Sequence, residues 1–94
     1  MAKAYKVYDG NNKLIDVFGK EQLCDYATHQ ICDNKGAYTE EGINKTLVVE
    51  PKQIVKIKSI VRKVVQESEY VGTVEQCKLV LKVLHYKVKE VELY

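Results

Sequence analysis

The spacing of apolar residues after Thr73 limits the folds open to this chain more than any other feature. Thr73 and Gln76 have the order and spacing of a capping box, which marks the start of a helix. The apolar residues that follow share one face of a helical wheel. They are Val74, Cys77, Val80, Leu81, Leu84, Val88 and Val91. The pattern predicts a helix over residues 73–91. Partial strand alternation within residues 78–94 leaves a helix end near His85, or a strand, as the alternative.

A second apolar stripe follows Pro51, a residue suited to the first position of a helix. Its members are Ile54, Ile57, Ile60, Val61, Val64 and Val65. They predict a helix over residues 51–66, although such β-branched residues also favour strands. Both stripes contain the three-and-four spacing of a coiled coil. We prefer two antiparallel helices packed on each other and on a sheet, with a homodimer seam as the alternative.

The first half of the chain predicts a hairpin and a helix. Residues 5–8 and 14–18 are rich in β-forming residues, and the Asp-Gly and Asn residues between them suit a tight turn. Residues 20–33 carry an apolar residue at every fourth position, which predicts a helix. We expect residues 34–45 to form a long loop and residues 46–49 a short strand. The chain is thus interpreted as one α+β domain over residues 1–94, in the order β-β-α-loop-β-α-α.

Composition predicts a cytosolic domain. Its 94 residues include no apolar run near the roughly 20 residues that span a bilayer, so no membrane association is expected. Three cysteines form no dense framework, which is typical of reduced thiols.

The residue types that catalysis and metal binding require are present but poorly spaced. Cys24 and Cys32 are eight residues apart on the predicted helix, roughly 12 Å along its axis, and cannot both reach one Zn²⁺. The chain has no nucleophile elbow, phosphate-binding loop or dinucleotide fingerprint. His85 is interpreted as an exposed polar residue rather than a general base. We therefore expect neither an enzyme nor a cofactor.

Positive charge concentrates in the second half of the chain. Residues 1–50 hold six lysines against eight acids, whereas residues 51–94 hold nine lysines or arginines against five acids. Two helix faces gather these cations. The first contains Lys52, Lys56, Arg62 and Lys63, and the second contains Lys78, Lys82, His85 and Lys89. Such faces can bind phosphates, although solvated lysines opposite an apolar stripe are the commoner case.

The loop predicted over residues 34–45 offers a different kind of site. Its lack of periodicity leaves Tyr38, Glu40 and Glu41 free of core packing. Tyrosine is enriched at protein interfaces because it combines apolar area with a hydroxyl. These three residues are the predicted contact with a protein partner.

Residues 70–77, with Val83 and Val88 beyond them, resemble short proteins of Gram-positive phages and mobile elements. In many of those proteins a Gly-Thr helix start leads into a unit like a helix-turn-helix, but residues 82–85 lack the glycine expected at the turn. The resemblance implies a phage-type accessory or inhibitor that occupies a host protein. We therefore expect a protein-binding module, with a nucleic-acid-binding regulator that uses the basic faces as the alternative.

Overall fold

The chain begins with the predicted hairpin. The computed structural model describes residues 2–93, of which β1 (Ala2–Tyr8) and β2 (Leu14–Phe18) form an antiparallel pair. Asp9 closes the turn, because its carboxylate accepts hydrogen bonds from the backbone N–H groups of Asn11 (2.8 Å) and Lys13 (3.0 Å). Asn12 has a φ of 62°, a conformation that asparagine tolerates.

Helices α1 (Lys20–Asp33) and α3 (Pro51–Glu67) also confirm the sequence-based predictions. Leu23, Ala27 and Ile31 of α1 are buried, as their spacing predicts. Ile57, Ile60 and Val64 of α3 are buried too, so the strand alternative for residues 52–66 is wrong. Helix propensity varies little among residues, whereas a buried apolar face stabilises a helix strongly, and this outweighs the β-branched composition of α3.

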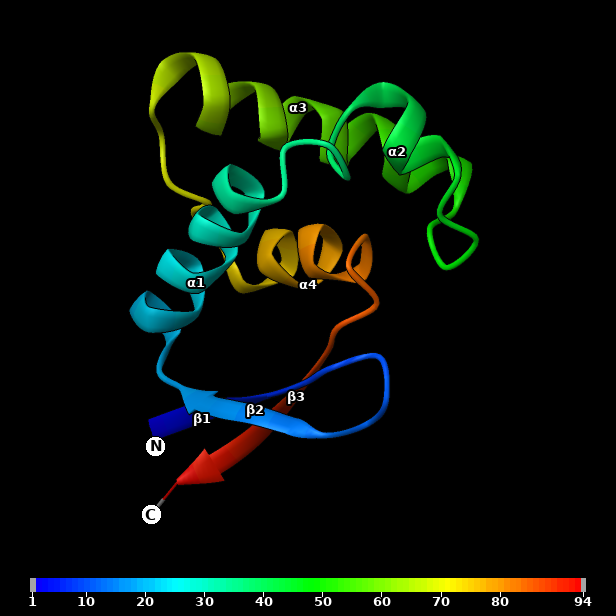
Figure 1. The fold of residues 1–94 in the computed structure, drawn as a ribbon. Helices are drawn as coiled ribbons and strands as arrows, with labels where there is room; N and C mark the ends of the chain where they lie inside the picture. The colour runs from blue at the N-terminus through cyan, green and yellow to red at the C-terminus, as the bar shows by residue number, and fades with distance from the viewer. Residues whose placement is uncertain (1, 94) are drawn as a thin grey trace.

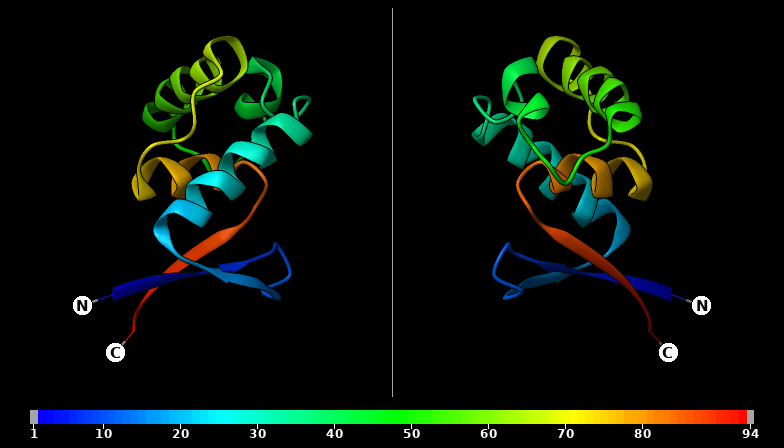
Figure 2. Two further views of the ribbon diagram at one scale, coloured as in Figure 1. Left: turned by 90° about the vertical axis from the view of Figure 1, so that its left-hand side faces the viewer. Right: turned by 90° about the vertical axis from the view of Figure 1, so that its right-hand side faces the viewer.

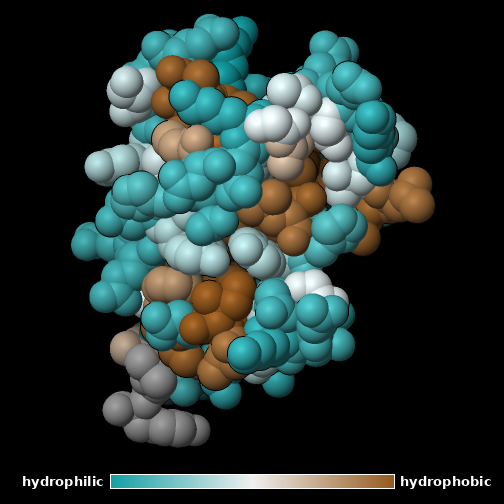
Figure 3. Space-filling view, viewed as in Figure 1, coloured by the Kyte–Doolittle hydropathy of each residue, from teal (hydrophilic) through white to brown (hydrophobic). Residues whose placement is uncertain are grey.

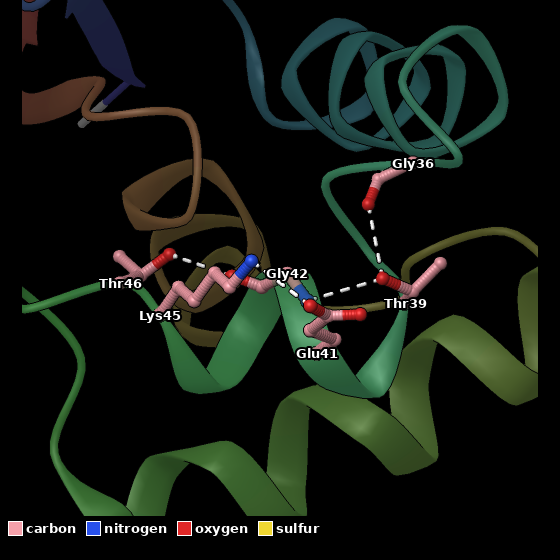
Figure 4. Close-up of polar contacts among 6 residues, drawn as sticks. All are labelled: Gly36, Thr39, Glu41, Gly42, Lys45 and Thr46. Carbon is pink, nitrogen blue, oxygen red and sulfur yellow. Dashed lines mark hydrogen bonds and ion pairs between the residues drawn. The ribbon is translucent and has the colours of Figure 1, made fainter.

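The predicted loop over residues 34–45 contains a helix, α2 (Glu40–Asn44). Thr39 caps it: its hydroxyl accepts from the Gly42 N–H (3.1 Å) and donates to the Gly36 carbonyl (3.0 Å), as Figure 4 shows. The strand predicted at residues 46–49 is wrong as well. That segment forms turns in which the Val49 N–H donates to the Thr46 carbonyl (3.3 Å).

The last predicted helix ends early, as its alternative allowed. Helix α4 (Val74–Lys82) is followed by a turn and by strand β3 (Lys87–Leu93), which pairs antiparallel with β1. The order of elements is therefore β-β-α-α-α-α-β. Thr73 caps α4 as predicted, because its hydroxyl accepts from the Gln76 N–H at 3.2 Å. Gln76, however, accepts from the Gly72 N–H (3.1 Å).

The three strands form one sheet in the order β2-β1-β3, with helices on one of its faces. Figures 1 and 2 show α1 and α4 over that face and α3 farther out, while no helix covers the opposite face of the sheet. Tyr5 and Val7 of β1 belong to the same buried cluster as Ile57 of α3 and Leu81 of α4. The fold is α+β, and its central strand and all three long helices share one core.

The apolar stripe of α4 packs in the core of its own chain. Cys77, Val80 and Leu81 are fully buried without any second copy, so this part of the stripe is not open to a dimer partner, while a homodimer through another surface stays a prediction. Val88 packs against the same core from β3 instead of extending the helical stripe. Among residues 2–93, no helix combines the length and the apolar character that a bilayer crossing requires.

Candidate functional site

The turn after α4 connects it to β3, so residues that the sequence predicts on one long helix lie on two elements that face each other. The Tyr86 N–H donates to the Leu81 carbonyl (3.1 Å) and the His85 N–H to the Lys82 carbonyl (2.9 Å), while His85 has a φ of 64°. This is the hydrogen-bond pattern of a Schellman motif, whose left-handed position usually holds glycine. Histidine is among the few other residues enriched in that conformation. Residues 82–85 thus form a turn although they contain no glycine. This turn leads into strand β3 rather than into the second helix of a helix-turn-helix unit.

A cavity of about 470 Å³ opens beside this turn. The sheet supplies one side of it, α4 another, and the segment between α2 and α3 a third. Its wall is formed by Gly10, Val48, Lys78, Lys82, His85, Tyr86, Lys87 and Val88, and we call it the basic cavity. A volume of this size falls within the range of pockets that bind small ligands or a few side chains.

Charge in the wall of the basic cavity has one sign. Three lysines and a histidine line it, and none of the lining residues is acidic. Glu75 approaches Lys78 from outside the wall, with 3.8 Å between Oε1 and Nζ, and both side chains retain solvent exposure. Lys87 donates to the Asn12 side chain at 3.1 Å, a neutral acceptor that leaves its charge uncompensated. The cavity is therefore arranged to attract anions.

The mouth of the basic cavity also carries apolar surface. Val48 lines the cavity and is 49% exposed, and its neighbour Leu47 is 97% exposed. Figure 3 shows this apolar surface as brown at the right-hand edge, over the segment between α2 and α3. A leucine that makes almost no contact within its own chain contributes nothing to folding and is available to a partner.

The residues predicted to contact a protein partner are only partly available. Tyr38 is 4% exposed, and its hydroxyl donates to the Val80 carbonyl of α4. Burial raises the pKa of this hydroxyl, which keeps it protonated as a donor. The prediction that Tyr38 is free of core packing is therefore wrong. A lone tyrosine in an aperiodic segment gives no sign that its side chain belongs to the core.

Glu40 and Glu41 are exposed, but each already has a cationic neighbour. Glu40 lies 2.9 Å from Lys58 of α3, and this hydrogen bond lowers the pKa of Glu40. Glu41 lies 2.9 Å from Lys45, one helical turn along (Figure 4). Glu40 lines a cavity of about 380 Å³ together with Tyr38 and Arg62. Both acidic side chains nevertheless stay largely exposed, Glu40 at 75% and Glu41 at 79%, so they remain open to a partner.

Replacing Tyr38 with phenylalanine tests its structural role. Tyr38→Phe is expected to lower the free energy of unfolding by about 1 kcal/mol, because a buried hydrogen bond is lost. The Val80 carbonyl keeps a second partner, the Val83 N–H at 3.3 Å, which limits the loss. Urea denaturation measures the change, with Tyr70→Phe as the matched control because Tyr70 is exposed. Equal effects of the two substitutions would contradict the buried hydrogen bond.

The two predicted basic faces have different outcomes. Lys52, Lys56, Arg62 and Lys63 remain together on the exposed side of α3. Among residues 2–93, none of these four forms an ion pair within 4.0 Å. The second face divides, because Lys78 and Lys82 lie on α4 whereas Lys89 lies on β3, opposite Lys6 of β1. Sequence reasoning missed Val48 and Lys87 in the wall of the basic cavity, and the exposed Leu47 next to Val48, since no periodicity links them to α4.

Neither a group of metal ligands nor a similarity to known proteins points to a function for this chain. Within the described part of the chain, no three histidine, cysteine or acidic side chains are grouped so as to hold a metal ion. No protein-family model matches the chain, and no curated protein and no solved structure matches it.

Proposed function

We propose that this protein is a non-enzymatic binding module that holds an acidic segment of a partner protein in the basic cavity. One observation carries the proposal: a concave wall with three lysines, a histidine and no acid includes the half-exposed Val48, whose chain neighbour Leu47 is 97% exposed. Carboxylates of the partner would meet the lysines, and an apolar residue of the same segment would cover Leu47. The charges would steer the encounter, and the apolar contact would slow dissociation.

Binding without catalysis agrees with the composition of the cavity wall. General acid–base and nucleophilic sites pair a reactive group with a second group that orients or activates it. His85 is exposed, and the wall contains neither a carboxylate to orient it nor a thiol or serine for it to activate. The lysines are suited to attract and hold an anionic partner.

The same arrangement suits a phage-type accessory or inhibitor protein, as the resemblance of residues 70–77 implies. Such a protein works by covering a surface of a host protein. It needs a binding surface rather than an active site. In this proposal the partner is a cytosolic protein with an exposed acidic segment.

Two double variants test the location of binding. Lys78→Gln/Lys82→Gln removes two charges from the basic cavity, and Lys52→Gln/Lys56→Gln removes two charges from α3. Both change the net charge equally, and glutamine preserves helix propensity. The probe is a fluorescein-labelled peptide of alternating glutamate and leucine, followed by fluorescence anisotropy. We expect the cavity variant to weaken binding about tenfold, roughly 1.4 kcal/mol, and the α3 variant to leave it nearly unchanged.

Leu47→Ala tests the apolar contact between the protein and the same peptide. It should weaken peptide binding severalfold without changing the melting temperature, because Leu47 is exposed. Equal losses in both double variants would show that only net charge matters. No measurable binding of the peptide by the unmodified protein would overturn the proposed acidic ligand.

Nucleic acid remains a second candidate because of one specific observation. The four cations on the exposed side of α3 form no ion pair within 4.0 Å among residues 2–93, which leaves their charges available to phosphates. In that case log affinity for duplex DNA falls with log salt by about 0.9 per phosphate contact. The α3 double variant would lose DNA binding that the cavity variant keeps, which is the reverse of the result expected for the peptide.

A further inference from the structure

Two of the three cysteines meet across the interface between α1 and α4. Cys24 Sγ and Cys77 Sγ lie 3.6 Å apart, although the residues are separated by 53 positions in the sequence. A disulfide needs about 2.05 Å between its sulfurs, so the two thiols must approach by roughly 1.6 Å in total. The third cysteine, Cys32, is exposed one turn beyond Thr28 on α1.

The backbone around the pair is held in place from two sides. The Thr28 hydroxyl donates to the Cys24 carbonyl (2.8 Å) and accepts from the Val71 N–H (3.0 Å), which fastens the segment before α4 to α1. The Cys77 N–H donates to the Thr73 carbonyl (3.0 Å) in the first turn of α4. The two sulfurs are therefore kept facing each other by contacts that do not involve them.

The two thiols differ in access to solvent. Cys77 is fully buried, whereas Cys24 is partly exposed and lines a cavity of about 480 Å³ between α1 and residues 70–72. Burial, with the neighbouring Cys24 sulfur as a second cause, raises the pKa of Cys77. A small oxidant can thus reach the partly exposed Cys24 but not the buried Cys77, which remains a protonated thiol.

We propose that Cys24 and Cys77 form a reversible intramolecular disulfide when the protein meets a peroxide. The Cys24 sulfur attacks one peroxide oxygen; an S–O bond forms, the O–O bond breaks, and the leaving hydroxide takes up the Cys24 thiol proton and departs as water. Cys77 then attacks the sulfur of the resulting sulfenic acid; the S–S bond forms, the S–O bond breaks, and the hydroxyl leaves as a second water with the thiol proton. Two thiols are oxidised, and one hydrogen peroxide is reduced to two waters.

Hydrogen peroxide and intact mass measurement test this proposal. The experiment uses Cys32→Ser, which removes the exposed competitor and leaves the pair untouched. After peroxide treatment we expect a monomer lighter by two hydrogens, with neither Cys24 nor Cys77 alkylated by iodoacetamide in denaturant. Dithiothreitol should restore both reactive thiols. The melting temperature of the oxidised protein should rise by roughly 10 °C, because the cross-link restricts the unfolded chain.

Cys24→Ser in the Cys32→Ser background is the matched control. It should show no loss of two hydrogens, and Cys77 should stay available to iodoacetamide once the protein is unfolded. A gain of two oxygens on Cys24 with Cys77 still free, a disulfide-linked dimer, or unchanged thiols after peroxide would each overturn the proposal. These readouts do not depend on partner binding, so the proposal stands or falls separately from the basic cavity.

Discussion

Leu81→Ala is expected to lower the free energy of unfolding by about 2–5 kcal/mol. Leu81 is fully buried in the core cluster that contains Val7, Leu23 and Ile57, so the substitution leaves a cavity at the point where α4, α1 and β1 meet. Alanine is the better helix former, and the loss therefore reflects packing rather than helix propensity. For a domain of 94 residues the melting temperature should fall by roughly 10–30 °C.

Leu47→Ala is the matched control, since it makes the same chemical change on a side chain that is 97% exposed. Urea denaturation should show its free energy of unfolding within about 0.5 kcal/mol of the unmodified protein. The slope of the unfolding curve should stay constant for both variants if each changes only stability. A small effect of Leu81→Ala would mean that α4 does not supply the core.

The elements that sequence reasoning predicted correctly are those in which local and tertiary preferences agree. The Asp9-Gly10 turn predicted the hairpin, and the every-fourth spacing of Leu23, Ala27 and Ile31 predicted α1. In α3 the wheel pattern decided correctly against the strand propensity of its β-branched residues. In each case one face is buried, and a periodic pattern records that burial directly.

The errors lie where partners distant in sequence decide the structure. Residues 87–93 are a strand because β1 offers them a free edge, and no local pattern reveals that edge. The helix end near His85 was only the alternative to a helix over residues 73–91, because histidine, not glycine, takes the left-handed position there. Helix α2 has only five residues, too few to show periodicity, and it depends on the Thr39 cap.

The candidate site was harder to predict for the same reason. Lys78 and Lys82 were predicted as part of a basic face, and both do line the basic cavity. The prediction placed Lys89 with them, whereas in the structure Lys87, at the start of β3, lines the cavity and Lys89, farther along the same strand, does not. Val48 joins the cavity only through the packing of the segment between α2 and α3, which no spacing rule anticipates.

Gly42→Ala should destabilise the protein by about 1–3 kcal/mol, although alanine within a helix usually stabilises by about 0.5–1 kcal/mol relative to glycine. A Cβ at residue 42 would lie 2.5 Å from the Ala37 carbonyl oxygen and 2.8 Å from the Gly36 carbonyl oxygen. Both obstacles are backbone atoms, so no side-chain rotation can relieve the contact. Helix α2 would have to move away from residues 36–37, which also strains the Thr39 cap seen in Figure 4.

Gly36→Ala is the control for this substitution. A Cβ at residue 36 would meet nothing within 4 Å, and the chain contains no glycine with positive φ among its described residues. The variant should therefore be neutral or more stable by up to about 1 kcal/mol, because alanine restricts the unfolded chain. Thermal and urea denaturation of the two alanine variants should thus give opposite signs. Equal effects would mean that α2 does not pack closely on residues 36–37.

The effect of Gly42→Ala should extend to the basic cavity. The Thr46 hydroxyl donates to the Gly42 carbonyl (3.2 Å), and the Thr46 N–H donates to the Ile43 carbonyl (3.1 Å), so α2 anchors the segment that carries Leu47 and Val48. A displaced α2 shifts this segment relative to Lys78 and Lys82 on α4. Binding of the glutamate–leucine peptide should weaken severalfold in Gly42→Ala and stay unchanged in Gly36→Ala, measured well below both melting temperatures. Loss of stability with full peptide binding would show that the cavity does not need α2 to hold its apolar side.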